Sequence, residues 1–136
     1  MVQSTEILNF LSEELNVKRE QFNMDSDLLK DFGVDGDDFS ELMDAFSEKF
    51  NVDISNLLWY FHHGEEGFNI GTIFFKPPYD RVDRIAVTPQ ILLESANLGK
   101  WVLEYPEHVL PERRYDMIIG WLFLGILILF ALIGWF

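Results

Sequence analysis

The sequence predicts an all-α protein in which a small acidic helical domain precedes one C-terminal membrane-spanning helix. Two observations lead to this prediction. Apolar residues recur at helical spacing in three segments with capping residues beside them, and the last twenty residues carry no charge. A chain of 136 residues suffices for one domain of about a hundred residues plus an appendage. We therefore expect a helical domain at 1–100, a spacer at 101–116 and a transmembrane helix at 117–136.

The first two predicted helices span 5–15 and 36–50. Ser4 and Asp35 precede them as capping residues, whose side-chain oxygens accept hydrogen bonds from free backbone amides. Apolar residues of the first helix lie at helical spacing: Ile7, Leu8, Leu11 and Leu15. Those of the second follow the same rule: Phe39, Leu42, Met43, Phe46 and Phe50. Each helix is therefore expected to bury one face.

A third helix is predicted at 89–98, between clear boundary signals. Thr88 suits the cap, Pro89 suits the first helical position, and Gly99 suits the left-handed residue that follows a helix. Two prolines lie in the region that follows, 101–116, and predict a short, stiff spacer before the membrane.

Residues 57–86 are predicted to be an inserted loop region of the helical domain. Gly and Pro interrupt this region, and only Phe68–Phe75 is expected to form a short extended piece. Its aromatic residues include Trp59, Tyr60, Phe61, Phe68, Phe74 and Phe75. We expect these rings to pack over the helices, with a ligand groove as the alternative.

The last twenty residues, Met117–Phe136, form the strongest single signal in the sequence. They are apolar on all faces, and as a helix they would extend roughly 30 Å, the thickness of a bilayer core. Trp121 and Trp135 lie near the two ends, where interfacial aromatic residues are common. This segment predicts a transmembrane helix, with a buried core helix as the alternative.

Basic residues predict how the chain is oriented in the membrane. Arg113 and Arg114 precede the apolar run, and the positive-inside rule therefore keeps residues 1–116 in the cytoplasm. The N-terminus has no basic segment before an apolar run and does not resemble a signal peptide. We expect a single-pass, tail-anchored protein of a bacterial inner membrane.

The charge and composition exclude several classes of function. Ten Lys and Arg residues against 23 Asp and Glu give a net charge of −13, which disfavours binding to a nucleic-acid backbone. There is no cysteine, so thiolate metal sites and a cysteine nucleophile are excluded. No nucleophile elbow and no phosphate-binding glycine loop is present. We expect a protein that is not an enzyme and has no catalytic residue.

Two clusters have the composition, but not the spacing, of metal sites. The first resembles a calcium loop in composition and holds Asp31, Asp35, Asp37 and Asp38. The twelfth position counted from Asp31 is Leu42, where an EF-hand needs Glu, so helix capping is the preferred interpretation. The second cluster holds His62, His63, Glu65 and Glu66. We expect these four residues in a surface loop and no bound metal.

The stretch Leu28–Phe50 resembles the signature of acyl carrier proteins around the serine that carries their prosthetic group. The residues in register are Asp31, Gly33, Asp35, Glu41 and Leu42, with Phe50 closing the helix. This resemblance implies a small acyl-carrier-like helical bundle, interrupted by the insertion at 57–86. In carrier proteins the acidic helix docks on basic patches of partner enzymes, so the resemblance implies a protein-binding surface here.

The sequence departs from carrier proteins at the decisive position. Gly36 occupies the place of the serine that accepts phosphopantetheine, and glycine has no hydroxyl for that bond. The G-V-D-G-D-D pattern of 33–38 is similar to that of a bacterial family of carrier-like proteins of unknown function. We therefore expect no cofactor. Ser40 is the nearest hydroxyl and the basis of an alternative, a true acyl carrier that serves membrane lipid chemistry.

The leading hypothesis is a non-enzymatic, membrane-tethered binding module. Residues 25–53 have a local charge of −8, which would steer a basic partner protein toward them. The expected contact residues are Asp35, Asp37, Asp38, Glu41, Asp44 and Glu48. Two alternatives stay open beside carriage at Ser40: a solvated acidic face that only confers solubility, and a purely membrane-structural protein whose domain is incidental.

Overall fold

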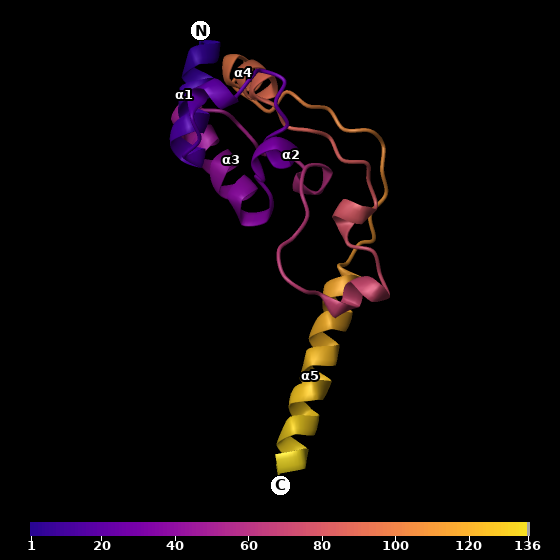
Figure 1. The fold of residues 1–136 in the computed structure, drawn as a ribbon. Helices are drawn as coiled ribbons and strands as arrows, with labels where there is room; N and C mark the ends of the chain where they lie inside the picture. The colour runs from indigo at the N-terminus through magenta and orange to yellow at the C-terminus, as the bar shows by residue number, and fades with distance from the viewer. Residues whose placement is uncertain (136) are drawn as a thin grey trace. The chain divides into compact units, whose positions relative to one another are not determined.

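The computed structural model describes residues 1–135 (Figure 1), and among these residues it holds helices and loops but no strand. The α-helices are α1 (Ser4–Leu15), α2 (Leu28–Phe32), α3 (Gly36–Phe50), α4 (Pro89–Leu98) and α5 (Tyr115–Trp135). The short 3-10 helices are η1 (Arg19–Gln21), η2 (Trp59–Phe61), η3 (Ile70–Ile73) and η4 (Pro78–Asp80). The all-α prediction is confirmed. The last residue of the predicted transmembrane helix, Phe136, lies outside the described residues.

The chain forms two compact units. The first, here called the helical unit, consists of residues 1–65 and 84–106 and contains α1 to α4. The second, here called the anchor unit, consists of residues 66–83 and the chain from residue 107 onward, and contains η3, η4 and α5.

Local capping residues set the ends of the three longer helices of the helical unit. The Asp35 carboxylate accepts from the Gly36 amide at 2.8 Å, and the Thr88 hydroxyl accepts from the Ile91 amide at 3.3 Å, as the sequence predicts. The predicted cap at Ser4 is wrong, because Ser4 already belongs to α1. The carboxylate of Glu6 instead accepts from the backbone amide of Gln3 at 2.6 Å, which moves the cap one residue earlier.

The core of the helical unit forms where α3 packs on α1. Phe10 of α1 lies 6.1 Å from Phe46 and 5.5 Å from Phe50, measured between ring centroids. The apolar face of α3 is buried apart from Phe50, which is half-buried. The other core residues are Ile7, Leu11, Phe22, Leu28, Val34, Val52, Val87, Leu92 and Trp101. Burial of each large apolar side chain contributes about 1.5–3 kcal/mol to stability.

The short helix α2 has no counterpart among the predicted elements. The Asp27 carboxylate caps it by accepting from the amides of Leu29 and Lys30, and Gly33 ends it with a φ of 69°. Asp27 also pairs with Arg84 at 2.5 Å, and this contact holds the pKa of the Asp27 carboxyl below its usual value. With five residues, α2 is too short for an apolar period to reveal it.

His62 lies inside the helical unit, with 2% of its surface exposed. Its expected place in a surface loop is wrong. The Nδ1 atom donates to the carbonyl oxygen of Ile85 at 2.8 Å, and the Nε2 atom lies 2.7 Å from the hydroxyl of Tyr105. Both partners are more than twenty residues away in the sequence, so no local pattern signals this burial.

The Tyr105 hydroxyl completes this buried network. Its oxygen accepts from the indole N–H of Trp101 at 2.8 Å and from the backbone amide of Leu58 at 3.2 Å. A hydroxyl has two acceptor positions and one donor, so its own proton is directed to Nε2 of His62. That arrangement requires a neutral imidazole, and burial lowers the pKa of His62 accordingly. The network also brings Trp101 and Tyr105, from the predicted spacer, into the helical unit.

In the anchor unit, the predicted extended piece at Phe68–Phe75 is wrong, because Ile70–Ile73 form the 3-10 helix η3. The Asn69 carboxamide oxygen accepts from the amide of Gly71 at 3.0 Å, and Thr72 donates its hydroxyl proton to the carbonyl oxygen of Asn69 at 2.8 Å. Side chains of Asn that bond to the backbone two residues later favour a turn over a strand.

The helix α5 is long and apolar enough to cross a membrane. It has 21 residues and extends about 31 Å, and an 18-residue window of it has a mean hydropathy of 2.7. It begins at Tyr115, two residues before the predicted start. Asp116 fits into the first turn because its carboxylate accepts from Arg114 at 2.7 Å and from the Asn69 amide group at 3.2 Å.

We expect the free energy of unfolding to fall as the pH drops from about 7.5 to about 5.5. The unfolded chain protonates His62 near pH 6.5, while the folded state keeps it neutral to a lower pH. The unfolded state then binds more protons, which favours unfolding as the pH falls. Urea denaturation of the full-length protein in detergent measures this dependence of the unfolding free energy on pH.

A His62→Asn variant should be less stable by about 1–3 kcal/mol at pH 7.5, and its unfolding free energy should depend less on pH. A His108→Asn control should keep the pH dependence of the wild type. An unchanged pH dependence in His62→Asn would contradict the assignment.

Candidate partner-binding surface

The acidic face of α3 is built by the same periodicity that buries its apolar face. Residues on the opposite side of the helix must face outward, because burying a carboxylate without a partner costs several kcal/mol. All six acidic residues expected to contact a partner are exposed: Asp35, Asp37, Asp38, Glu41, Asp44 and Glu48. None of them forms an ion pair with Lys or Arg within residues 1–135. We call these six residues the acidic face.

The second half of the acidic face disfavours the helix that carries it. Asp37 and Asp38 lie in the first turn, where the positive end of the helix dipole stabilises them. Asp44 and Glu48 lie four residues apart farther along the helix, and like charges at that spacing destabilise a helix by about 0.2–0.5 kcal/mol. Helix stability therefore does not account for the second half of the acidic face.

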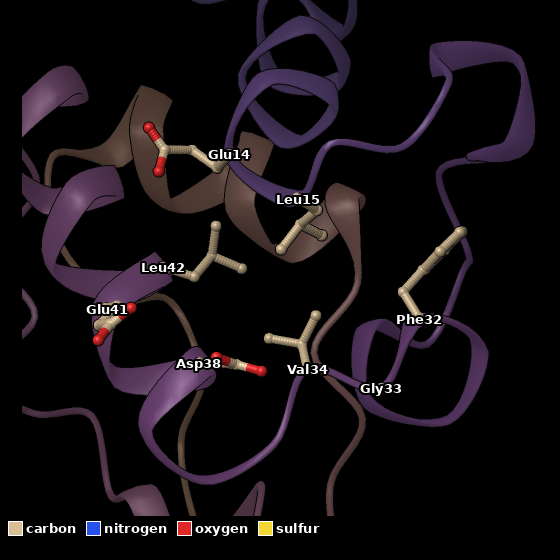
Figure 2. A pocket seen from close by; sticks show the side chains of 8 residues that line it. All are labelled: Glu14, Leu15, Phe32, Gly33, Val34, Asp38, Glu41 and Leu42. Atoms are coloured by element: carbon tan, nitrogen blue, oxygen red, sulfur yellow. The ribbon is translucent and has the colours of Figure 1, made fainter.

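A hollow of about 260 Å³ opens beside the first half of α3 (Figure 2). Figure 2 shows the side chains of Leu15, Val34 and Leu42 pointing toward one another in it. Three carboxylates line the same hollow: Glu14, Asp38 and Glu41. Phe32 and Gly33 complete its lining. Carboxylates beside a small apolar surface are the chemistry that accepts a cationic side chain with an aliphatic stem, such as Arg or Lys.

The start of α3 is covered by residues that follow η2. The Asp35 carboxylate accepts from the amide of Gly64 at 3.1 Å as well as from that of Gly36, and it lies 3.9 Å from Nδ1 of His63. The His63 ring packs on Phe39 with its centroid 4.8 Å away. The Asp35 side chain therefore joins the beginning of α3 to a segment nearly thirty residues later.

Gly36 is buried at this junction with a φ of 52°. That value lies in the left-handed region, which costs an L-residue roughly 1–2 kcal/mol and which glycine adopts freely. The backbone conformation at the start of α3 thus suits the glycine that the sequence has there. The alternative attachment site, Ser40, is exposed one turn later on α3.

Three of the residues considered as metal ligands have other partners: Asp31, Asp35 and His62. The Asp31 carboxylate accepts from the backbone amide of Asp27 at 2.9 Å, and Asp35 makes the contacts given above. His62 uses both ring nitrogens within the helical unit. Within residues 1–135, no three His, Asp or Glu side chains are grouped to hold a metal ion.

Four residues at this surface were not predicted from the sequence as part of it: Glu14, Leu15, His63 and Gly64. They join it through contacts between segments that are distant in the sequence. Only Glu14 could have been suspected from the sequence, because its carboxylate adds to the negative charge. The six residues of the acidic face, in contrast, follow from the period of a single helix.

Residues 2–104 match a family described as "Protein of unknown function (DUF1493)". The chain belongs to the DUF1493 family. The DUF1493 match includes α1 to α4, the acidic face and the hollow, and ends before α5. No curated protein and no solved structure matches the chain.

A Gly36→Ala variant should lower the free energy of unfolding by about 1–2 kcal/mol, because the added Cβ is strained at positive φ. Urea denaturation of the full-length protein in detergent gives this value. Ser40→Ala is the matched control on the same helix, and its exposed position predicts a change within about 0.5 kcal/mol. Equal stability of Gly36→Ala and the wild type would contradict the left-handed conformation at Gly36.

Proposed function

We propose that this protein is a non-enzymatic, membrane-tethered module with an acyl-carrier-like helical unit, which presents the acidic face of α3 to a basic partner protein. The observation that carries the proposal is the exposure of six carboxylates that form no ion pair with Lys or Arg in the described chain, beside a hollow lined by carboxylates and by Leu15, Val34 and Leu42. The four helices of the helical unit, with the carrier-like motif at the start of α3, support the comparison with carrier proteins.

The charges favour binding of a basic protein in particular. The helical unit contains 17 of the 23 acidic residues and six of the ten basic residues. Such a field accelerates encounter with a basic partner and makes association sensitive to salt. The hollow adds a place for one Arg or Lys side chain, whose stem would lie on Leu15 and Leu42 while its cation meets Asp38 and Glu41.

The conformation of Gly36 favours binding over carriage. A phosphopantetheine arm needs a hydroxyl at the start of α3, where Gly36 is buried at positive φ and the neighbouring Asp35 accepts from the amide of Gly64. Ser40 lies within α3 between acidic residues and has no side chain beside it that marks it as an attachment point. We therefore prefer a module that binds protein and carries no acyl group.

The location proposed for this module is the cytoplasmic face of a bacterial inner membrane. The apolar helix α5 supplies the tether, and Arg113 and Arg114 precede it. By the positive-inside rule, these two arginines favour a helical unit on the cytoplasmic side.

Reversing three charges of the acidic face tests the proposal. The triple variant Glu41→Lys, Asp44→Lys, Glu48→Lys should lose partner capture when the full-length protein is purified from membranes in mild detergent, because its charge then repels a basic surface. Its free energy of unfolding should change by no more than about 1 kcal/mol, since the three sites are exposed.

The control changes the net charge equally at another part of the helical unit. It carries Glu13→Lys, Glu20→Lys and Glu104→Lys, three exposed positions outside the acidic face. This control should capture the same proteins as the wild type. If the acidic-face variant co-purifies with an unchanged set of proteins, the acidic face is a solubilising surface and the proposal is wrong.

A further inference from the structure

The anchor unit exposes large apolar side chains outside its apolar helix. Phe68 is 88% exposed, Ile73 is 71% exposed and Phe74 is 69% exposed. All three flank or belong to η3, which packs against α5 within the anchor unit. Large apolar side chains grouped on a surface mark a place where a protein or a membrane binds.

Two glycines hold η3 directly against the first turns of α5. A Cβ atom added to Gly71 would collide with the backbone carbonyl of Asp116, and one added to Gly120 would lie 2.6 Å from the Asn69 carboxamide oxygen. The carboxamide of Asn69 also donates to the Asp116 carboxylate at 3.2 Å. The position of η3 along α5 is therefore fixed by close packing as well as by hydrogen bonds.

This packing places η3 at the membrane interface when α5 spans the bilayer. The contacts reach from Asp116 to Gly120, which covers about 6 Å of the helix axis. The uncharged run begins at Met117, within the same stretch. The apolar side chains on η3 thus lie level with the first turn of the apolar helix, where acyl chains meet headgroups.

Basic residues surround the same place. A small hollow of about 50 Å³ beside the start of α5 includes four of the chain's ten Lys and Arg residues in its lining: Lys76, Arg81, Arg113 and Arg114. Arg114 is paired with Asp116, whereas Lys76, Arg81 and Arg113 are exposed. In a chain of net charge −13, this grouping fits the phosphates of anionic headgroups.

We propose that residues 68–81 form a second membrane-contacting element, which lies in the bilayer interface on the platform of α5. Phe68, Ile73 and Phe74 enter the boundary between headgroups and acyl chains, and Lys76, Arg81 and Arg113 contact anionic headgroups. This inference rests on the membrane tether of the proposed function and is independent of the basic partner.

Spin labels on single cysteines test this placement, because the natural chain has no cysteine that would compete for the label. Full-length Ile73→Cys and Phe74→Cys variants are labelled in vesicles of phosphatidylcholine and phosphatidylglycerol. Collision rates with oxygen, which concentrates in lipid, are compared with those of a water-soluble nickel chelate. Glu107→Cys, exposed in the same unit, is the aqueous control, and Leu124→Cys reports whether α5 is inserted.

Labels at 73 and 74 should show an oxygen-to-nickel collision ratio several-fold above that of the label at 107. If the labels at 73 and 74 were as accessible to nickel as the label at 107, while the label at 124 was exposed to lipid, this proposal would be overturned and the tether would stand. Protection of labels 73 and 74 from both reagents would also overturn it, since protein, such as a second copy of this chain, would then cover η3. Nickel access at 124 would refute the tether itself.

The Gly71→Ala variant tests the platform. Its Cβ is incompatible with the backbone of Asp116, so it should separate η3 from α5 and lower the collision ratio of the label at 74 toward the aqueous value. Gly125→Ala is the matched control, because a Cβ there meets no atom within 4 Å. An unchanged ratio in Gly71→Ala would overturn the role of α5 as the platform of this element.

Discussion

The burial of one face of α3 in the core is the constraint on which the helical unit depends. Phe39, Leu42 and Phe46 are each at most 3% exposed, which fixes the rotation of the helix about its axis. That rotation leaves the carboxylates of the acidic face no position but the surface. It also sets the direction of the Asp35 side chain, whose bond to the Gly64 amide brings residues 62–64 over the start of α3. The candidate surface is thus a consequence of core packing.

Features fixed by neighbours along the chain could be predicted from the sequence. The period of apolar residues in α3, the caps Asp35 and Thr88, and the uncharged run of α5 each specify one element locally. Features that depend on distant partners could not be predicted. The burial of His62 requires Ile85 and Tyr105, and the hollow beside α3 requires the end of α1. At Asn69 a local turn signal was present, but the aromatic residues around it suggested a strand.

The two units separate two kinds of surface chemistry. The helical unit carries most of the negative charge and most of its apolar side chains lie in one core. The anchor unit exposes apolar side chains and gathers basic residues at the start of α5. The first chemistry suits a basic protein and the second suits a lipid surface. Each unit also has a glycine that its local structure requires. Gly36 has a positive φ at the start of α3, and Gly71 has no side chain that would collide with the backbone of Asp116.

We propose that a carrier-like helical unit serves here for binding, without a covalent cofactor. The decisive measurement is the intact mass of the full-length protein after co-expression with a phosphopantetheinyl transferase and purification in detergent. We expect the mass of the unmodified chain, because Gly36 offers no hydroxyl and is buried at the start of α3. A mass increased by one phosphopantetheine group, mapped by peptide analysis to Ser40, would contradict it.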